Sequence, residues 1–273
     1  MEKIVSLFVD KKDLNNKFID CLLIPYKNYS CRSKYELNFN EIKNLLTTKK
    51  IYLLCDALIS EEEIETLKKD FLDMIKIADK IFFQDFSFIM IAKKYNCLDK
   101  LVFYSPTLCV NYQDIKVLQN IGINDFILSK ENTYHDYIEI LKNSSSTLGM
   151  LSLGYPQLYF SKRKMLSCFQ KEYNLSFSFE NLFIKEKTRS FYKPIYEDYQ
   201  GTFIFAGSIF FPFKVLHEFK TLGMEYFLID PSFISFEIDF AELVHNALNN
   251  SLKECEFASN YLMNHQMVND YGK

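Results

Sequence analysis

Residues 80–105, KIFFQDFSFIMIAKKYNCLDKLVFYS, contain the unit that decides the fold. The stretch begins with a short apolar run at 80–84, continues with an amphipathic segment at 86–96, and ends with a second apolar run at 101–105. Short apolar runs are typical of strands buried on both faces, and the middle segment has helical spacing. The stretch therefore predicts a strand, a helix and a second strand, which is the repeating unit of a parallel sheet.

The same unit recurs along the chain. Helical patterns at 60–78, 111–122 and 132–144 separate further apolar runs, and Ser60 with Glu63 has the spacing of a capping box. The runs that we expect to form strands are residues 4–9, 18–24, 51–55, 80–84, 101–105, 125–129, 148–153 and 225–230. Eight strands alternating with helices predict an α/β fold, a TIM-like (β/α)8 barrel, and the length of 273 residues suits one barrel domain over residues 1–273.

Two segments depart from this alternation. Residues 175–206 alternate apolar and polar side chains and carry a turn signal at Gln200-Gly201, so we expect a β-hairpin insert after the seventh strand, over the barrel mouth. Residues 240–273 begin with helical spacing, so we expect a C-terminal helical tail.

Composition excludes several classes of protein. The formal charge of -3 gives no global field for nucleic acid or an anionic surface, so a basic site must be local. No segment reaches the roughly 20 apolar residues of a membrane span, and the N-terminus lacks the features of a signal peptide. The seven cysteines are scattered and form no CxxC pair, which is typical of a reducing compartment. We therefore expect a cytoplasmic protein without a membrane partner.

Functional groups of a parallel barrel gather at the carboxyl ends of its strands. Two loops there hold several polar groups each, Ser129-Lys130-Glu131 and Ser161 with Arg163. The other strand-end candidates are Asp10, Tyr26, Asp56, Gln84, Asp85, Ser105, Tyr155 and Asp230. For most of these residues we favour a loop cap or a surface residue over a functional role, and for the carboxylates an ion pair with Lys130 or Arg163 over catalysis.

Four segments resemble the peptidase U32 family, the collagenase-like proteases and their relatives. They are YSCRSKYELNFNEI at 29–42, IGINDFILSKENTYHDYIEI at 121–140, GYPQLYFSKRKMLSCF at 154–169 and FYKPIYEDYQGTFIF at 191–205. Their order and spacing agree with the family over roughly residues 20–230, which is far more specific than one short motif.

The resemblance implies site residues position by position. Glu131 matches the acidic residue of a Ser-Arg-Glu motif in which Lys130 replaces the arginine, and Ser161 and Arg163 match a Tyr-Ser-basic motif. The hairpin motif falls on Glu197, Asp198, Gly201 and Thr202. We expect Glu131 and Ser161 as catalytic residues, and as substrate-binding residues Lys130, Tyr155, Tyr159, Arg163 and Asp198.

Relatives in the family are implicated in the hydroxylation of tRNA uridine and of the ubiquinone ring, often with an iron–sulfur cluster. This chain has Lys164 and Met165 where the family motif commonly places a cysteine, and the downstream cysteine pair is missing. A four-iron cluster needs four thiolates brought together, so we expect none. No HExxH or paired His/Cys spacing occurs, so we expect no metal site either.

Three functions stay open. The first is an enzyme acting on RNA, in tRNA wobble-uridine hydroxylation, with Lys130 and Arg163 as an anion site and Tyr155 and Tyr159 as stacking surfaces. The second is a peptide hydrolase that uses the strand-end carboxylates, although the four histidines lie in helical stretches away from Ser161. The third is a non-catalytic partner of a longer paralogue, or of a second copy of the chain.

Overall fold

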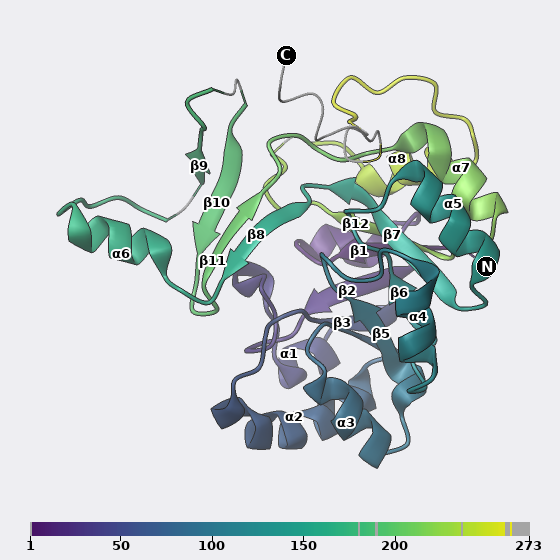
Figure 1. Cartoon of the computed structure of the whole chain (residues 1–273), viewed down its shortest axis with the longest axis horizontal. Coiled ribbons are helices and arrows are strands. Elements are labelled where there is room, and N and C mark those ends of the chain that lie inside the picture. The colour runs from purple at the N-terminus through teal and green to yellow at the C-terminus, as the bar shows by residue number, and fades with distance from the viewer. Residues whose placement is uncertain (1, 180, 189–190, 236, 260–262, 264–273) are drawn as a thin grey trace.

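The computed structural model describes residues 2–179, 181–188, 191–235, 237–259 and 263. Eight parallel strands close into a barrel in the order β1-β12-β7-β6-β5-β4-β3-β2 (Figure 1). Their bounds are β1 Lys3–Leu7, β2 Cys21–Pro25, β3 Lys50–Cys55, β4 Lys80–Phe83, β5 Leu101–Tyr104, β6 Asp125–Ile127, β7 Thr147–Gly154 and β12 Tyr226–Asp230. Each overlaps one of the eight expected runs, so the predicted barrel is confirmed.

Helices connect the strands and cover the outside of the barrel. The α-helices of the barrel are α1 Phe39–Lys43, α2 Ile64–Ile77, α3 Ser87–Lys94, α4 Tyr112–Gln119, α5 Tyr134–Asn143, α7 Phe213–Thr221 and α8 Phe240–Leu248. Short 3-10 turns lie at η1 Lys11–Asn15, η2 Ser33–Tyr35, η3 Glu61–Glu63 and η4 Leu98–Lys100. In η3 the Glu63 carboxylate accepts a hydrogen bond of 2.7 Å from the backbone N–H of Ser60, which is one bond of the expected capping box, and a second of 2.7 Å from the Ser60 hydroxyl. Among the described residues, the helices are too short or too polar to cross a membrane.

Two layers of apolar side chains result from the alternation along each strand. One set points into the barrel, where Tyr52, Phe82 and Tyr226 lie with ring centroids 5.6 to 6.2 Å apart and fill the interior. The other set packs outward against the helices and forms the larger core. The barrel is therefore a filled support, and any site must lie at its ends.

The insert after β7 is a four-stranded antiparallel sheet in the order β8-β11-β10-β9. It comprises β8 Gln157–Ser161, β9 Leu182–Ile184, β10 Lys193–Glu197 and β11 Thr202–Phe205, with α6 Met165–Glu172 between β8 and β9. Figure 1 shows it extending from one side of the barrel. The hairpin at Gln200-Gly201 is the expected one, but the insert begins at Gln157, earlier than residue 175. Edge strand β8 shows no alternation of buried and exposed residues, so a strand signal is missing from this stretch.

Gly154 is the point where the chain leaves the barrel. Its φ of +150° lies outside the range that other residues readily adopt, and a Cβ there would lie 2.6 Å from the backbone oxygen of Asp230. Its backbone exchanges hydrogen bonds with Phe210, where the insert returns. Glycine therefore allows the exit of β7 and its close approach to β12.

The C-terminal tail is helical over a shorter stretch than expected. Helix α8 ends at Leu248, and Asn250 follows with a φ of +55°, the left-handed conformation that commonly ends a helix. Residues 251–259 contain no helix, and Ser259 forms a β-bridge with Phe210. Of the remaining expected tail, only Met263 is among the described residues.

Candidate functional site

A buried arginine occupies the carboxyl-terminal mouth of the barrel. Arg32, in the loop after β2, is 5% exposed, and its guanidinium lies 3.0 Å from Asp230 at the end of β12 and 3.7 Å from Asp56 after β3. Asp56 also accepts hydrogen bonds from the Ser30 hydroxyl and the Cys31 backbone N–H. The three charges thus tie three strand ends together.

The two carboxylates offset the cost of burying Arg32. Burial alone would lower the pKa of this guanidinium, but Asp230 and then Asp56 outweigh burial and raise it, so the side chain stays charged. A buried charge that keeps its partners and hydrogen bonds is tolerated, whereas one that loses a partner is strongly destabilising. The mouth is therefore a rigid, pre-formed polar centre.

The insert packs directly on this centre. The guanidinium carbon of Arg32 lies 5.0 Å from the ring centroid of Phe205 on β11, and the Tyr196 hydroxyl on β10 donates to the backbone oxygen of Cys31. Phe203, Phe205 and Cys31 belong to one small buried cluster, separate from the two barrel cores. The position of the insert is thus set by the same loop that carries Arg32.

A small cleft opens beside the ion-paired centre. Its free volume is about 40 Å³, and it is lined by Asp56, Gln84, Tyr104, Ser105, Pro106, Leu128, Lys130, Leu151, Pro156 and Gln157. Gln84, Ser105 and Lys130 follow three successive strands, β4, β5 and β6, and Tyr104 is the last residue of β5. The Gln84 amide donates to the backbone oxygen of Asp56, which fixes its orientation.

The structure places Lys130 in this cleft and pairs it with Glu131. The Lys130 side chain is 11% exposed and that of Glu131 is 48% exposed, so the two residues differ sharply in their surroundings. Burial lowers the pKa of Lys130. The loop itself is held by Ser129, whose hydroxyl donates to the backbone oxygen of Pro106 at 2.7 Å.

Ser161 and Arg163 lie on the insert. Ser161 ends β8, where it pairs with Thr202 of β11, and its hydroxyl accepts a hydrogen bond from the Arg163 backbone N–H. Within the described part of the chain no carboxylate or imidazole bonds to Ser161, and neither residue bonds to Lys130. His135, His217 and His245 lie in helices, and His265 lies outside the described residues. The lining residue that β8 supplies to the cleft is Gln157 instead.

The two tyrosines of the corner differ in exposure. Tyr155 is half-buried at the base of the insert, packs on two buried clusters, and has its pKa raised by burial. Tyr159 is 41% exposed, and its hydroxyl lies 3.3 Å from the sulfur of Met165. Tyr159 alone presents a free ring surface to solvent.

The hairpin motif holds the insert together. The Glu197 carboxylate accepts hydrogen bonds from the backbone N–H groups of Leu166 and Ser167, and so caps the first turn of α6. Asp198 accepts from the backbone N–H groups of Gln200 and Gly201 and closes the turn between β10 and β11. Asp198 thus has a local structural role, and the substrate binding that the sequence predicts for it stays a prediction.

The thiols do not fit an iron–sulfur cluster. All seven cysteines are free: Cys21, Cys31, Cys55, Cys97 and Cys109 are buried, Cys255 is half-buried, and Cys168 is exposed on α6. No three His, Cys, Asp or Glu side chains of the described residues are arranged to hold a metal ion. Burial raises the pKa of the Cys31 and Cys55 thiols, the opposite of what a metal-binding thiolate needs.

The family follows from a comparison over nearly the whole chain. The sequence model described as peptidase family U32 matches residues 10–267. The chain belongs to this family. The four U32 segments include the Arg32 loop, the Lys130 loop, the β8 corner and the β10–β11 hairpin, so the family motifs of this U32 protein surround one end of the barrel. No curated protein matches the chain.

Two solved structures resemble this U32 protein weakly. One is the C-terminal domain of a putative chitinase from Desulfitobacterium hafniense DCB-2, with 11% identity, a TM-score of 0.44, and coverage of 92% of this chain and 99% of that one. The other is the Bacillus cereus spore cortex-lytic enzyme SleL, with 11% identity, a TM-score of 0.37, and coverage of 91% and 74%. At these TM-scores neither structure supports an inference about function.

Sequence reasoning placed Asp56, Gln84, Ser105, Lys130 and Asp230 at strand ends, and all five lie at the mouth. It missed Arg32 and Tyr104 as site residues. Arg32 stands inside the first U32 segment, and that segment was the available signal. Tyr104 is the last residue of an apolar run, where a hydroxyl at the strand end could have marked it.

Proposed function

We propose that this U32 protein acts on RNA, in the hydroxylation of tRNA wobble uridine that the resemblance implies or in a related RNA modification, with the insert as the RNA-binding surface. The supporting observation is the uneven charge along the chain. Residues 157–201 hold eight of the 32 Lys and Arg but five of the 35 Asp and Glu, so this segment carries +3 and the rest of the chain -6. A local basic surface is what RNA phosphates require.

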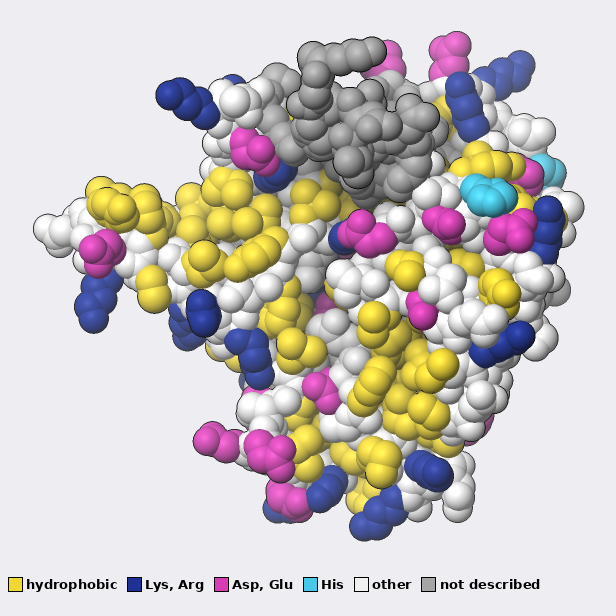
Figure 2. Space-filling view, viewed as in Figure 1, with side chains coloured by type: hydrophobic (Ala, Val, Ile, Leu, Met, Phe, Trp, Pro, Cys, Tyr) yellow, Lys and Arg dark blue, Asp and Glu magenta, His cyan; other side chains and the backbone are white. Residues whose placement is uncertain are grey.

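Aromatic side chains are exposed among these cations. Tyr159, Phe169, Tyr173, Phe183 and Tyr192 are 41 to 64% exposed. The Lys185 ammonium lies 5.0 Å from the ring centroid of Tyr192, and Figure 2 shows apolar and basic groups mixed on the insert. Single strands bind proteins through backbone contacts to cations and stacking on aromatic rings, which contributes about 1–3 kcal/mol per base.

The insert lies against the barrel mouth, which supports one continuous path for an RNA strand from the insert to the cleft. Lys162 donates from its ammonium to the backbone oxygen of Leu58, in the loop after β3, at 3.0 Å. Together with the contacts of Tyr196 and Phe205 at the Arg32 loop, this bond holds the base of the insert beside the cleft. A nucleotide bound on the insert would therefore lie near the strand-end groups. Since the thiols do not fit a cluster, we assign no step to one.

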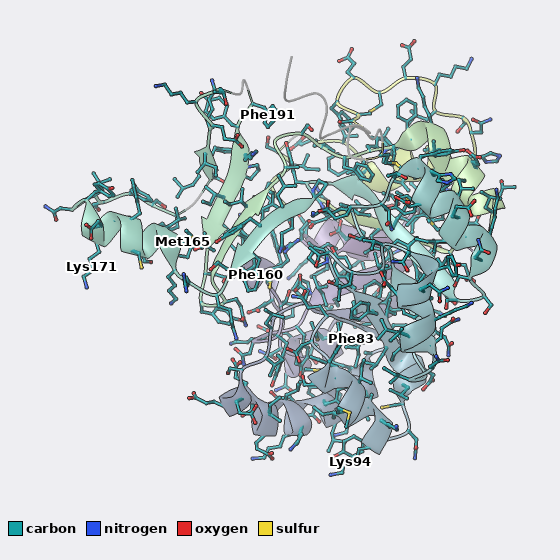
Figure 3. All side chains as sticks on the ribbon, viewed as in Figure 1. Phe83, Lys94, Phe160, Met165, Lys171 and Phe191 are labelled. Atoms are coloured by element: carbon teal, nitrogen blue, oxygen red, sulfur yellow. The ribbon has the colours of Figure 1, made fainter. Side chains whose placement is uncertain are left out.

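The test compares two charge reversals of equal size. Arg163→Glu with Lys164→Glu removes two exposed cations of the insert, and Lys93→Glu with Lys94→Glu removes two exposed cations of α3. Figure 3 shows Lys94 at the bottom of the view, away from the insert residue Lys171 at the left. Binding of a tRNA to the full chain is measured by fluorescence anisotropy over a series of salt concentrations.

We expect the insert pair to lower the affinity at least about tenfold at low salt. It should also reduce the slope of log K against log salt by about 0.7 for each phosphate that the variant no longer neutralises, while the α3 pair keeps the wild-type slope. An equal decrease in affinity in the two variants, or a wild-type protein that does not bind tRNA, would contradict the proposal.

A further inference from the structure

The cleft contains polar atoms that the fold does not use. Within the described residues, no hydrogen bond involves the Tyr104 hydroxyl, the Ser105 hydroxyl or the side-chain oxygen of Gln84. Ser105 is only 6% exposed, and all three residues line the cleft. None of the three atoms is sealed from solvent, so water can pair with them when the cleft holds no ligand. Their convergence on one cleft indicates that a ligand, or water in its absence, completes their hydrogen bonds.

The charges around the cleft favour a neutral ligand. Arg32 and Lys130 supply two positive charges, and three carboxylates, Asp56, Glu131 and Asp230, supply three negative ones. Each cation already has a carboxylate partner, so a further anion would compete with those partners and would meet a net negative surrounding. A group that bears no charge enters at a lower electrostatic cost.

The direction of each hydrogen bond further limits which functional groups of a ligand fit the cleft. Because the Gln84 nitrogen donates to Asp56, its side-chain oxygen is left to accept an N–H. The Lys130 ammonium has three N–H groups, of which Glu131 takes one, and the Tyr104 hydroxyl can donate as well. The cleft thus offers an acceptor next to donors, which is complementary to a carbonyl oxygen beside an N–H.

The size of the cleft fits only part of a molecule. A cavity needs about 10–15 Å³ for each water, so a free volume of about 40 Å³ corresponds to roughly three waters. Leu128, Leu151 and two prolines supply apolar walls for a flat group. One edge of a ring enters such a space, and the rest of the molecule stays outside.

We propose that this cleft binds the amide or imide edge of a neutral planar ligand, with Gln84 accepting its N–H and Lys130, Tyr104 and Ser105 donating to its carbonyl oxygen. The identity of the ligand rests on the proposed function. If the protein acts on RNA, the edge belongs to a nucleobase with a carbonyl beside a ring N–H. Ser105, Tyr104 and Gln84 become specificity-determining residues of the U32 site.

The test uses free nucleosides, which can enter the cleft without contacting the exposed cations of the insert. Binding of uridine and of N3-methyluridine, which lacks the ring N–H, is measured by ligand-detected NMR with the full chain. We expect uridine to bind and N3-methylation to weaken binding about tenfold or more. Tyr104→Phe and Ser105→Ala should each weaken uridine binding about fivefold, the effect of one hydrogen bond, whereas Tyr95→Phe, a matched change on the exposed C-cap of α3, should not.

Equal binding of the two nucleosides, or unchanged binding in both cleft variants, would overturn the proposal. The insert double variant distinguishes it from the proposed function. Loss of tRNA binding in Arg163→Glu with Lys164→Glu, with uridine binding retained, supports both proposals. If that variant still binds tRNA, and N3-methylation still weakens uridine binding, the result supports the proposal for the cleft and contradicts the proposal for the insert.

Discussion

Arg32 and Asp230 form an ion pair of 3.0 Å across 198 positions of the chain, between the loop after the second strand and the end of the last. Both residues are largely buried, and the pair joins the first and last quarters of the protein at the barrel mouth. Since the Phe205 ring covers the same guanidinium, the pair also fixes where the insert rests.

Removing one member of this pair should destabilise the protein severely. Asp230→Asn leaves Arg32 with Asp56 alone at 3.7 Å, and breaking a buried ion pair costs about 3–5 kcal/mol. Urea unfolding measures the decrease in stability. The control is Asp73→Asn, which breaks an exposed pair with Lys76 on α2 and should leave the midpoint close to that of the wild type. Similar midpoints for the two variants would show that Arg32 does not depend on Asp230.

Stability should fall as pH rises toward neutrality because of Glu36. Burial raises the pKa of this carboxyl from 4.5 to about 7, and nearby Asp198 adds to the increase. The folded chain therefore binds more protons than the unfolded chain between these two pKa values, so the free energy of unfolding decreases as pH rises through that window. Glu36→Gln should remove this component, as urea midpoints at about pH 5 and about pH 8 would reveal.

Tyr199→Phe should raise the pKa of Glu36 further, whereas Glu36→Gln removes the titrating group. The Tyr199 hydroxyl donates to Glu36 and lowers the pKa that burial has raised. Without that hydroxyl the pKa of Glu36 should increase further, and the window of pH-dependent stability should extend upward. A pH dependence identical to that of the wild type in both variants would exclude Glu36 as its cause.

Gly201 should tolerate alanine far less well than Gly223. Both have positive φ, +141° and +102°, but a Cβ at Gly201 would lie 2.0 Å from the backbone oxygen of Ser161, whereas a Cβ at Gly223 meets nothing within 4 Å. Gly223→Ala carries only backbone strain of about 1–2 kcal/mol. Gly201→Ala must in addition separate β8 from the hairpin, so limited proteolysis should cut its insert, and not its barrel, faster than in Gly223→Ala. Equal proteolysis of the two would contradict this assignment.

The sequence was sufficient for the barrel because each strand is encoded locally. Runs such as 80–84 and 101–105 are apolar on both faces, and that pattern does not depend on distant residues. The insert was harder to predict from the sequence, since Gln157–Ser161 is a half-exposed edge strand in which buried and exposed residues do not alternate. Its helix α6 is capped by Glu197, some 30 residues away, which no local pattern reveals.

The site could be predicted only in part for a similar reason. Strand ends identified Asp56, Gln84 and Lys130, because the fold alone brings them to one end. The burial of Arg32 depends on Asp230, a partner nearly 200 positions away. The catalytic roles of Glu131 and Ser161 stay predictions.

The order of the strands has a consequence for synthesis on the ribosome. The barrel closes only when β12 enters between β1 and β7, and the start of β12 at Tyr226 lies 72 positions after the end of β7 at Gly154. At the usual rates of elongation, roughly 4 to 14 seconds pass between the two events. During this interval the nascent chain holds seven strands with two open edges, and an antiparallel sheet must form beside them without pairing with either.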